Sequence, residues 1–329
     1  MSKTKIVPNR TLQLLGIFSL LAGAVLPACG QELSILTGVT KEIPTNDNSF
    51  AWVADYSEPI NKIFSYSLVY VNEGHLIDHH RDGMGGQIWA GYSLTPKWSV
   101  KVGWGPYLYF DTAAKPAPVI AGDDHGIGAI TSLATTFQYS KHWGLELRAN
   151  RILTKNSIDT TSIVAGLRYQ YDASVLPGSS AGADWWRIDS QTPNEVTVYA
   201  GRTYVNNFES ETATAYGMEY RRNLSRHLEW TAGALREGNP GPIDRTGVMS
   251  EIWGTRTVLN NHAVLGVGIG PYIGYDSRDN DRARLSGVLS ITGAVKLPGN
   301  LVARATWHRV ATSYNRDTDV FLFGVGYRW

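Results

Sequence analysis

The sequence repeats itself, and this internal duplication limits the possible folds more than any other feature. Gly105–Thr112 (GPYLYFDT) matches Gly270–Ser277 (GPYIGYDS). Arg81–Trp89 and Arg245–Trp253 match at their Arg, Gly, Ile and Trp positions. The matching segments keep their order along the chain, which is typical of one structural unit that occurs twice.

Each unit contains segments that favour eight β-strands. Apolar and polar side chains alternate along many of them, as in Phe64–Glu73 and Leu301–Arg309, and this period of two is typical of strands. No central stretch is long and apolar enough for a membrane helix. The sequence therefore predicts an all-β, antiparallel fold of sixteen strands in two units, at about residues 31–172 and 195–329. The linker at 173–194 contains Pro, Gly and Ser.

The final strand indicates that the sheets are closed barrels in a membrane. One face of this strand carries a row of large apolar side chains, namely Phe321, Phe323, Val325, Tyr327 and Trp329. The ending resembles the C-terminal targeting signal of outer-membrane barrels, which implies the barrel-assembly machinery as a partner. A barrel in lipid turns apolar residues outward and tolerates polar residues inside. We therefore expect a transmembrane antiparallel β-barrel.

The N-terminus has the three parts of a secretory signal peptide. Its basic, apolar and small-residue parts are Lys3, Lys5 and Arg10, then Leu12–Leu26, then Ala28 and Gly30. We predict that residues 1–30 are removed by cleavage before Gln31. The single cysteine, Cys29, leaves a lipoprotein-type cleavage open as an alternative. The mature protein is then expected in the outer membrane of a Gram-negative bacterium.

Short and long connections alternate along the chain. The four longer polar segments of the first unit are Lys41–Asn48, His75–Gly85, Asp111–Gly126 and Thr154–Asp159. Barrels of this class have short periplasmic turns and longer outer loops. We therefore expect these four segments to be loops on the outer side, and the linker to lie on the periplasmic side.

The sequence leaves two arrangements open, one sixteen-stranded barrel or two eight-stranded barrels. The inward face of Val264–Asp276 carries Gly266, Gly268, Gly270 and Gly274. Such small residues suit a narrow, filled barrel, whereas a wide barrel leaves an aqueous channel. Chains of this class usually form a single barrel, which favours the sixteen-stranded arrangement.

The charge of the chain excludes one class of partner. Its 30 basic and 29 acidic residues give a net charge of +1, which provides no field to attract nucleic acid. The expected partners are outer-membrane lipids and lipopolysaccharide.

Histidines and carboxylates concentrate in two predicted outer loops of the first unit, where they would meet at one rim. An imidazole beside a carboxylate suits proton transfer near neutral pH. The candidate catalytic residues are Glu73, His75, His79, His80, Asp82, Asp111 and His125. The same region could hold a divalent cation, with His79, His80, Asp82, Asp123 and Asp124 as candidate ligands. Such a cation is the only cofactor that the sequence suggests.

The second unit lacks these histidines, since Asn239, Ile243 and Asp244 stand at the positions of His75, His79 and His80. Four rim residues are shared by both units, and they are Glu73, Arg81, Asp111 and Arg151, matched by Glu237, Arg245, Asp276 and Arg309. We expect the shared residues to build the rim and the histidines to add a property to the first unit alone.

The closing strands resemble those of small lipid A-modifying barrels of the PagL deacylase and PagP palmitoyltransferase type. The resemblance runs from Trp307-His308-Arg309 through Asn315 and Asp317 to Gly324–Trp329. The deacylases carry a His-x-Ser pair on a late strand. His308 matches that histidine, but Val310 stands at the serine position and Ser313 lies off the pattern. Asn150 replaces His308 in the first unit, so the pair is intact in neither unit and the resemblance implies the fold more than the activity.

Three functions remain open at this stage. The first is a binding or structural barrel with a His- and Asp-rich extracellular rim, which the missing catalytic pair favours. The second is a lipid A-modifying hydrolase or acyltransferase that uses the same rim. The third is a pore, which requires the sixteen-stranded form.

Overall fold

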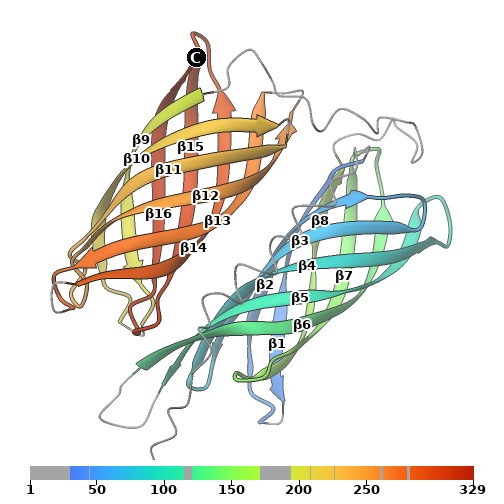
Figure 1. Ribbon diagram of the computed structural model, residues 1–329. Helices are drawn as coiled ribbons and strands as arrows, with labels where there is room; N and C mark the ends of the chain where they lie inside the picture. Colours follow the sequence, from blue (N-terminus) through green and yellow to red (C-terminus); the bar gives the residue numbers. More distant parts are fainter. Residues whose placement is uncertain are drawn as a thin grey trace, which may run out of the picture. The chain divides into compact units, whose positions relative to one another are not determined.

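The structure of the protein is a computed structural model (Figure 1). The residues that it describes are 30–43, 45–114, 121–170, 194–207, 209–225, 227–259, 262–279 and 282–329. They form two compact units. The signal peptide and the linker lie almost entirely outside the described residues, so both stay predictions.

The first unit is a closed barrel of eight antiparallel strands that pair in chain order (Figure 1). Its strands are β1 (Glu32–Ile43), β2 (Asn48–Pro59), β3 (Phe64–Leu76), β4 (His79–Ser93), β5 (Trp98–Ala114), β6 (Ala121–Gln138), β7 (Trp143–Leu153) and β8 (Asp159–Gln170). Strand β1 also pairs with β8, from Glu32 opposite Gln170 to Ile43 opposite Asp159. This pairing closes the barrel and leaves no free sheet edge.

The second unit repeats the same architecture. Its strands are β9 (Asn194–Val205), β10 (Thr212–Ser225), β11 (Leu228–Gly238), β12 (Arg245–Val258), β13 (Ala263–Asp276), β14 (Arg282–Lys296), β15 (Leu301–Ala311) and β16 (Thr318–Arg328). Strand β16 pairs with β9 and closes the barrel. The backbones of Trp329 and Asn194 continue the ladder with hydrogen bonds of 3.1 and 3.3 Å.

The predicted all-β class with sixteen antiparallel strands is confirmed, and the structure decides between the two arrangements. The first and last strands of each unit pair with each other, so the described strands form two eight-stranded barrels. No sixteen-stranded sheet forms among the described residues. The pore hypothesis required a single sixteen-stranded barrel, and the described strands do not form one.

Two of the predicted outer loops are wrong, because strands continue through them. Within His75–Gly85, strands β3 and β4 leave only the turn Ile77-Asp78, where Asp78 has a φ of 60°. Asp tolerates this left-handed conformation better than most residues do. Within Asp111–Gly126, β5 continues to Ala114 and β6 begins at Ala121. The polar residues of these two segments therefore lie largely on paired strands.

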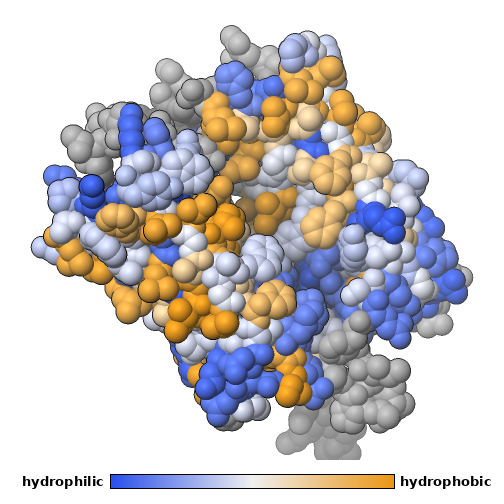
Figure 2. Space-filling model, turned by 180° about the vertical axis from the view of Figure 1, so that it is seen from behind, coloured by the Kyte–Doolittle hydropathy of each residue, from blue (hydrophilic) through white to orange (hydrophobic). Residues whose placement is uncertain are grey.

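The outward faces of both barrels are apolar. They include Ile35, Val39, Trp104, Leu133 and Ile163 in the first barrel and Val198, Met218, Val248, Ile273 and Phe323 in the second. Figure 2 shows hydrophobic side chains gathered in broad surface patches. Trp104 and Phe323 expose 62% and 70% of their surface, which is unfavourable in water and suits lipid. The strands are therefore membrane-spanning.

Within the described part of the chain, no helix combines the length and the apolar character needed to cross a membrane.

Aromatic side chains collect at the barrel ends that carry the short turns. Trp98 packs on Phe137 with ring centroids 4.9 Å apart, and Trp143 packs on Tyr169 at 4.8 Å. Tyr220 makes the corresponding contact in the second barrel with Trp230 at 6.1 Å. Rings at this level are the usual anchors at a membrane interface.

A buried tryptophan fills the interior of each barrel, and a glycine on the next strand makes room for it. Trp89 and Trp253 are 1% and 0% exposed. A Cβ atom added to Gly103 would lie 2.5 Å from Trp89, and one added to Gly268 would lie 2.5 Å from Trp253. The inward glycines of β13 therefore serve the filled interior that the sequence suggested.

Replacing Gly268 with Val tests this packing. We expect the second barrel to lose about 1–3 kcal/mol of unfolding free energy, because the added side chain overpacks the ring of Trp253. Gly254→Val is the matched control, since a Cβ atom there meets nothing within 4 Å. Urea unfolding in lipid vesicles measures both variants. Equal stability of the two variants would contradict the packing argument.

Candidate functional site

A buried ion pair lies inside the first barrel near its outer rim, the end at which β3 meets β4 and β5 meets β6. Arg81 on β4 donates to both carboxylate oxygens of Glu73 on β3, at 2.5 and 3.0 Å. It also donates to Thr160 at 2.9 Å and to Ser157 at 3.1 Å. Both charged side chains are at most 1% exposed. This bidentate geometry is the form in which a buried pair best offsets its desolvation.

The second barrel contains the same ion pair. Arg245 donates to both carboxylate oxygens of Glu237, at 2.6 and 2.7 Å, and to Thr318 at 2.8 Å. The hydroxyl of Tyr272 donates to Glu237 at 2.7 Å. The matched Glu and Arg are therefore structural in both barrels, as the sequence comparison suggested.

The second arginine that the two units share, Arg151 or Arg309, lies outside the buried ion-pair cluster. Arg151 on β7 donates to Thr161 at 3.1 Å, and Arg309 on β15 donates to Asp319 at 2.7 Å. Each is next in sequence to an inward, buried residue, Asn150 or His308. Since neighbouring side chains on a strand point to opposite faces, these arginines face outward and are not part of the buried rim cluster.

Asp111 is the centre of a polar cluster at the mouth of the first barrel. Nδ1 of His79 lies 2.8 Å from its Oδ2, and the hydroxyl of Ser157 donates to the same oxygen at 2.6 Å. Oδ1 of Asp111 is buried and has no hydrogen-bond partner among the described residues. The His79 side chain is 24% exposed and that of Asp111 is 1% exposed, so solvent reaches the cluster through His79.

The equivalent carboxylate of the second barrel is fully paired. Asp276 accepts from Arg316 at 2.9 Å through Oδ2. Its Oδ1 accepts the backbone N–H groups of Asp244 and Arg278, each at 3.0 Å. The two rims therefore differ in a specific way. A permanent cation and two amides hold Asp276, whereas a histidine and a serine hold Asp111.

Two acidic groups in the loops of the second rim are also held by arginines. A hydrogen bond from Arg236 lowers the pKa of Asp244, which stands at the position of His80. A hydrogen bond from Arg284 likewise lowers the pKa of Asp279. Both carboxylates therefore stay charged at neutral pH, and the second rim presents paired charges in place of histidines.

The remaining histidines of the predicted site lie on the outer face of the first barrel. His80 follows the inward His79 and precedes the inward Arg81, so its side chain points outward. Its ring packs on that of His75, with centroids 4.2 Å apart. His125 lies near Phe110 at 6.3 Å. These groups therefore contact the outside of the wall and not its lumen.

The single catalytic cluster that the sequence suggested is split by the barrel wall. Glu73, His79 and Asp111 face the lumen, whereas His75, His80, Asp82 and His125 face outward. Tyr70 donates to the outward Asp82 at 2.6 Å. The division arises because the suggested loops are strands, along which successive side chains alternate between faces. An irregularity between Asn72 and His75 shifts the register of β3 against β4, so His75 faces outward although Glu73, two residues before it, faces inward. A catalytic role of these residues stays a prediction.

The predicted metal ligands are divided in the same way. His79 and Asp124 lie on inward positions, whereas His80, Asp82 and Asp123 lie on outward ones. The positions on β6 follow from strand pairing, since Asp124 pairs with the inward Asp111 and Asp123 pairs with the outward Thr112. Among the residues that the structure describes, no group of three or more His, Cys, Asp or Glu side chains could hold a metal ion. The structure therefore does not bring the five predicted ligands together.

The histidine of the deacylase-like segment is buried inside the second barrel. His308 is 1% exposed, and its Nδ1 shares a hydrogen bond of 2.7 Å with the hydroxyl of Ser290 on β14. Ser290 is 0% exposed. The pair differs from the expected His-x-Ser arrangement on one strand, and a substrate in the membrane cannot reach a hydroxyl that is sealed inside the wall.

A further ion-pair layer lies around each buried tryptophan. In the first barrel, Arg148 pairs with Asp55 at 3.2 Å and with Glu146 at 2.6 Å, and it lies 5.0 Å from the ring of Trp89. The sequence reasoning missed this layer, although alternating Glu-x-Arg pairs on inward positions were visible.

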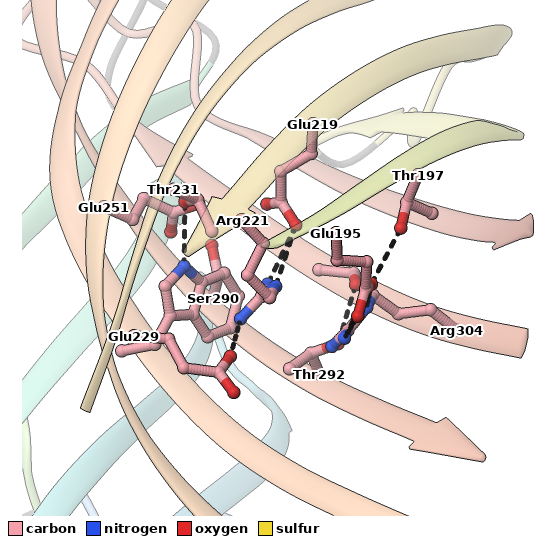
Figure 3. A network of polar contacts seen from close by, with 12 residues as sticks. Glu195, Thr197, Glu219, Arg221, Glu229, Thr231, Glu251, Ser290, Thr292 and Arg304 are labelled. Atoms are coloured by element: carbon pink, nitrogen blue, oxygen red, sulfur yellow. Dashed lines mark hydrogen bonds and ion pairs between the residues drawn. The ribbon is translucent and has the colours of Figure 1, made fainter. Parts of the chain in front are cut away.

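The second barrel has the corresponding layer. Arg221 pairs with Glu219 at 2.9 Å and with Glu229 at 2.7 Å, and it lies 4.4 Å from the ring of Trp253 (Figure 3).

The sequence reasoning also missed Ser157, the hydroxyl partner of Asp111 in the first barrel, because nothing in its loop sequence distinguishes it.

Known proteins add little to this description. No protein family and no curated protein matches the chain. The N-terminal β-barrel domain of Pseudomonas aeruginosa OprF is similar, with 9% identity and a TM-score of 0.35, and the match covers 43% of this chain and 99% of that one. Ail, the attachment invasion locus protein of Yersinia pestis, gives 10% identity and a TM-score of 0.31 over 45% and 100%. The KdgM porin gives 7% and 0.19 over 91% and 99%.

Similarity at this level concerns the barrel fold alone and carries no argument about activity. The resemblance to PagL- and PagP-type enzymes gains no support from it. The site must therefore be interpreted from its own geometry.

Replacing Arg81 with Ala tests the rim ion pair. We expect a loss of about 3–5 kcal/mol of unfolding free energy, because Glu73 would remain buried without a counter-charge. The double variant Arg81→Met with Glu73→Gln should lose clearly less. Arg151→Ala, on the outer face, is the control and should change stability by about 0.5 kcal/mol or less. Urea unfolding measures all three, and equal losses for the single and double variants would refute the ion-pair explanation.

Proposed function

We propose that the protein is a non-enzymatic barrel of the outer membrane of a Gram-negative bacterium that binds a ligand at the mouth of its first barrel. The observation that carries this proposal is the unpartnered Oδ1 of Asp111 beside the partly exposed His79. A buried acceptor without a donor costs free energy. A ligand that supplies a donor or a positive charge would remove that cost.

The second barrel supports this interpretation as an internal control. Its Asp276 accepts three hydrogen bonds from within the protein, so it offers no acceptor to a ligand. The two barrels share the ion pair beneath, but only Asp111, and not Asp276, keeps a carboxylate oxygen without a hydrogen-bond partner among the described residues. The ligand class that fits is a hydrogen-bond-donating cation, either an ammonium group or a hydrated divalent ion, the latter held mainly by Asp111 with His79 at its side.

An enzymatic role has weaker support. A lipid A-modifying hydrolase would need a nucleophile and a base that face its substrate. At the first rim, Ser157 donates to Asp111 and not to an imidazole. The buried Ser290–His308 pair is 0% and 1% exposed. The geometry therefore favours binding over acyl transfer.

Location is tested by fractionation. The apolar outer walls predict that the mature protein is recovered from the outer membrane with detergent, in a form that migrates faster on a gel when it is not boiled, as folded barrels do. A folded protein in the aqueous periplasmic fraction would contradict this proposal.

Binding is tested with Ca²⁺, Mg²⁺ and spermidine as separate probes. A probe at a hundred times its dissociation constant should raise the unfolding free energy by about 2.7 kcal/mol. Asp111→Asn should abolish this increase, since the carboxylate is lost. Asp82→Asn, on the outer face, is the matched control and should keep it. Loss of the increase in Asp82→Asn but not in Asp111→Asn would place the site on the outer wall, and no increase with any probe would refute a cation ligand.

A further inference from the structure

Three polar side chains meet inside the second barrel at the level of Trp253, away from the rim. Glu251 on β12, Ser290 on β14 and His308 on β15 are 0%, 0% and 1% exposed. Nδ1 of His308 lies 2.7 Å from the hydroxyl of Ser290 and 3.9 Å from Oε2 of Glu251. Figure 3 shows Glu251 and Ser290 close to the arginine layer but not within its ion pairs.

Glu251 differs from its neighbours because its charge is not matched by a permanent cation. Neither of its carboxylate oxygens has a hydrogen-bond partner among the described residues. The nearby Arg221 is committed to Glu219 and Glu229. An isolated buried carboxylate is strongly unfavourable in a medium of low dielectric constant.

The other interior cations cannot serve Glu251 either. Arg304 and Arg328 both bind Glu195, at 2.9 and 2.8 Å. Lys296 lies at the end of β14, six residues beyond Ser290, which is about 20 Å along a strand. Among the described residues, His308 is therefore the base that lies next to Glu251.

The groups that face the cluster from the other strands are few. Tyr199 on β9, Glu219 and Arg221 on β10 and Glu229 on β11 are the titratable or charged ones. At this level β13 contributes glycine, and β16 contributes Val320, which pairs with His308 across the strands. At this level, neither of these two strands carries a side chain that can neutralise Glu251.

The first barrel contains a neutral version of the same cluster. Gln87, Ser132 and Asn150 occupy the equivalent places. Gln87 donates to Ser132 at 3.0 Å, Ser132 donates to Asn150 at 2.7 Å, and Asn150 donates to Ser162 at 3.1 Å. This barrel therefore carries no charge at that level and needs no proton there, although Oε1 of Gln87 has no hydrogen-bond partner among the described residues.

We propose that Glu251, Ser290 and His308 form a proton-binding site inside the second barrel. The folded barrel takes up one proton, which the carboxylate and the imidazole share, with the serine hydroxyl next to both. A proton on Glu251 makes it a neutral acid that can donate a hydrogen bond. A proton on His308 makes the pair an ion pair. Either form removes the lone buried charge, and the proton comes from water as the chain folds.

The site gives stability a defined dependence on pH. Above neutral pH an unfolded glutamate and an unfolded histidine carry almost no proton, whereas the folded site keeps one. The folded state then binds more protons than the unfolded state, so stability falls as pH rises. The unfolding equilibrium constant should increase by up to tenfold per pH unit, for as long as the folded site keeps its proton.

The test exchanges the cluster for its neutral counterpart. Glu251→Gln with His308→Asn gives the second barrel the Gln, Ser and Asn of the first, a combination that a barrel of this shape already accommodates. Urea unfolding in lipid vesicles between pH 7 and 9 is measured for this variant and for wild type. Wild type should show the steeper loss of stability, and it should take up about one more proton on refolding at pH 8, as a pH indicator dye records.

Two further variants make the result decisive. Gln87→Glu with Asn150→His should install a second such dependence in the first barrel. Glu251→Gln alone removes the acid at constant shape, and it replaces the double variant if the latter does not fold. Equal pH slopes and equal proton uptake in wild type and the variants without Glu251 would overturn the proposal.

Discussion

The narrow interior of an eight-stranded barrel is the constraint on which the rest of this structure depends. Such a barrel is just wide enough for its own side chains, so inward charges lose water and need partners inside the wall. Both barrels meet this demand with a bidentate Arg–Glu pair near the rim and an arginine layer on a buried tryptophan. The glycines opposite each tryptophan follow from the same lack of space.

The duplication separates what the fold needs from what each barrel adds. Positions that keep their residues, such as Glu73 with Arg81, hold the walls together in both units. Positions that differ change the partner of a carboxylate. His79, at whose position the second unit has Ile243, holds Asp111, whereas Arg316 holds Asp276. A carboxylate oxygen without a hydrogen-bond partner among the described residues thus lies at the mouth of the first barrel, in Asp111, and in the interior of the second, in Glu251. Exchanging the side chain that holds a carboxylate changes the chemistry of the rim but leaves the strand register unchanged, so the barrel fold tolerates the exchange.

Much of the fold could be predicted from the sequence, because alternation and the final aromatic strand are local signals. The number of barrels could not, since it depends on which distant strands pair. The linker and the inward glycines of β13 favoured two barrels, whereas the usual single barrel per chain favoured one. The candidate site was predicted less well. Glu73, His79 and Asp111 do lie at one rim, but Ser157 carried no signal, and the ion-pair layers depend on contacts between strands far apart in sequence.

The division of the histidines shows why a polar segment alone could not define the site. A loop would allow His75, His79 and His80 to converge, whereas a strand sends neighbours to opposite faces. The turn at Ile77-Asp78 keeps β3 and β4 paired up to their last residues, so the pleat extends to the rim. His79 therefore meets the carboxylate of Asp111 inside, while His75 and His80 stack on each other outside. Residues that are adjacent in sequence therefore lie in two environments, the lumen and the outer face of the wall. In the lumen, the imidazole of His79 contacts Asp111, whose Oδ1 has no hydrogen-bond partner among the described residues.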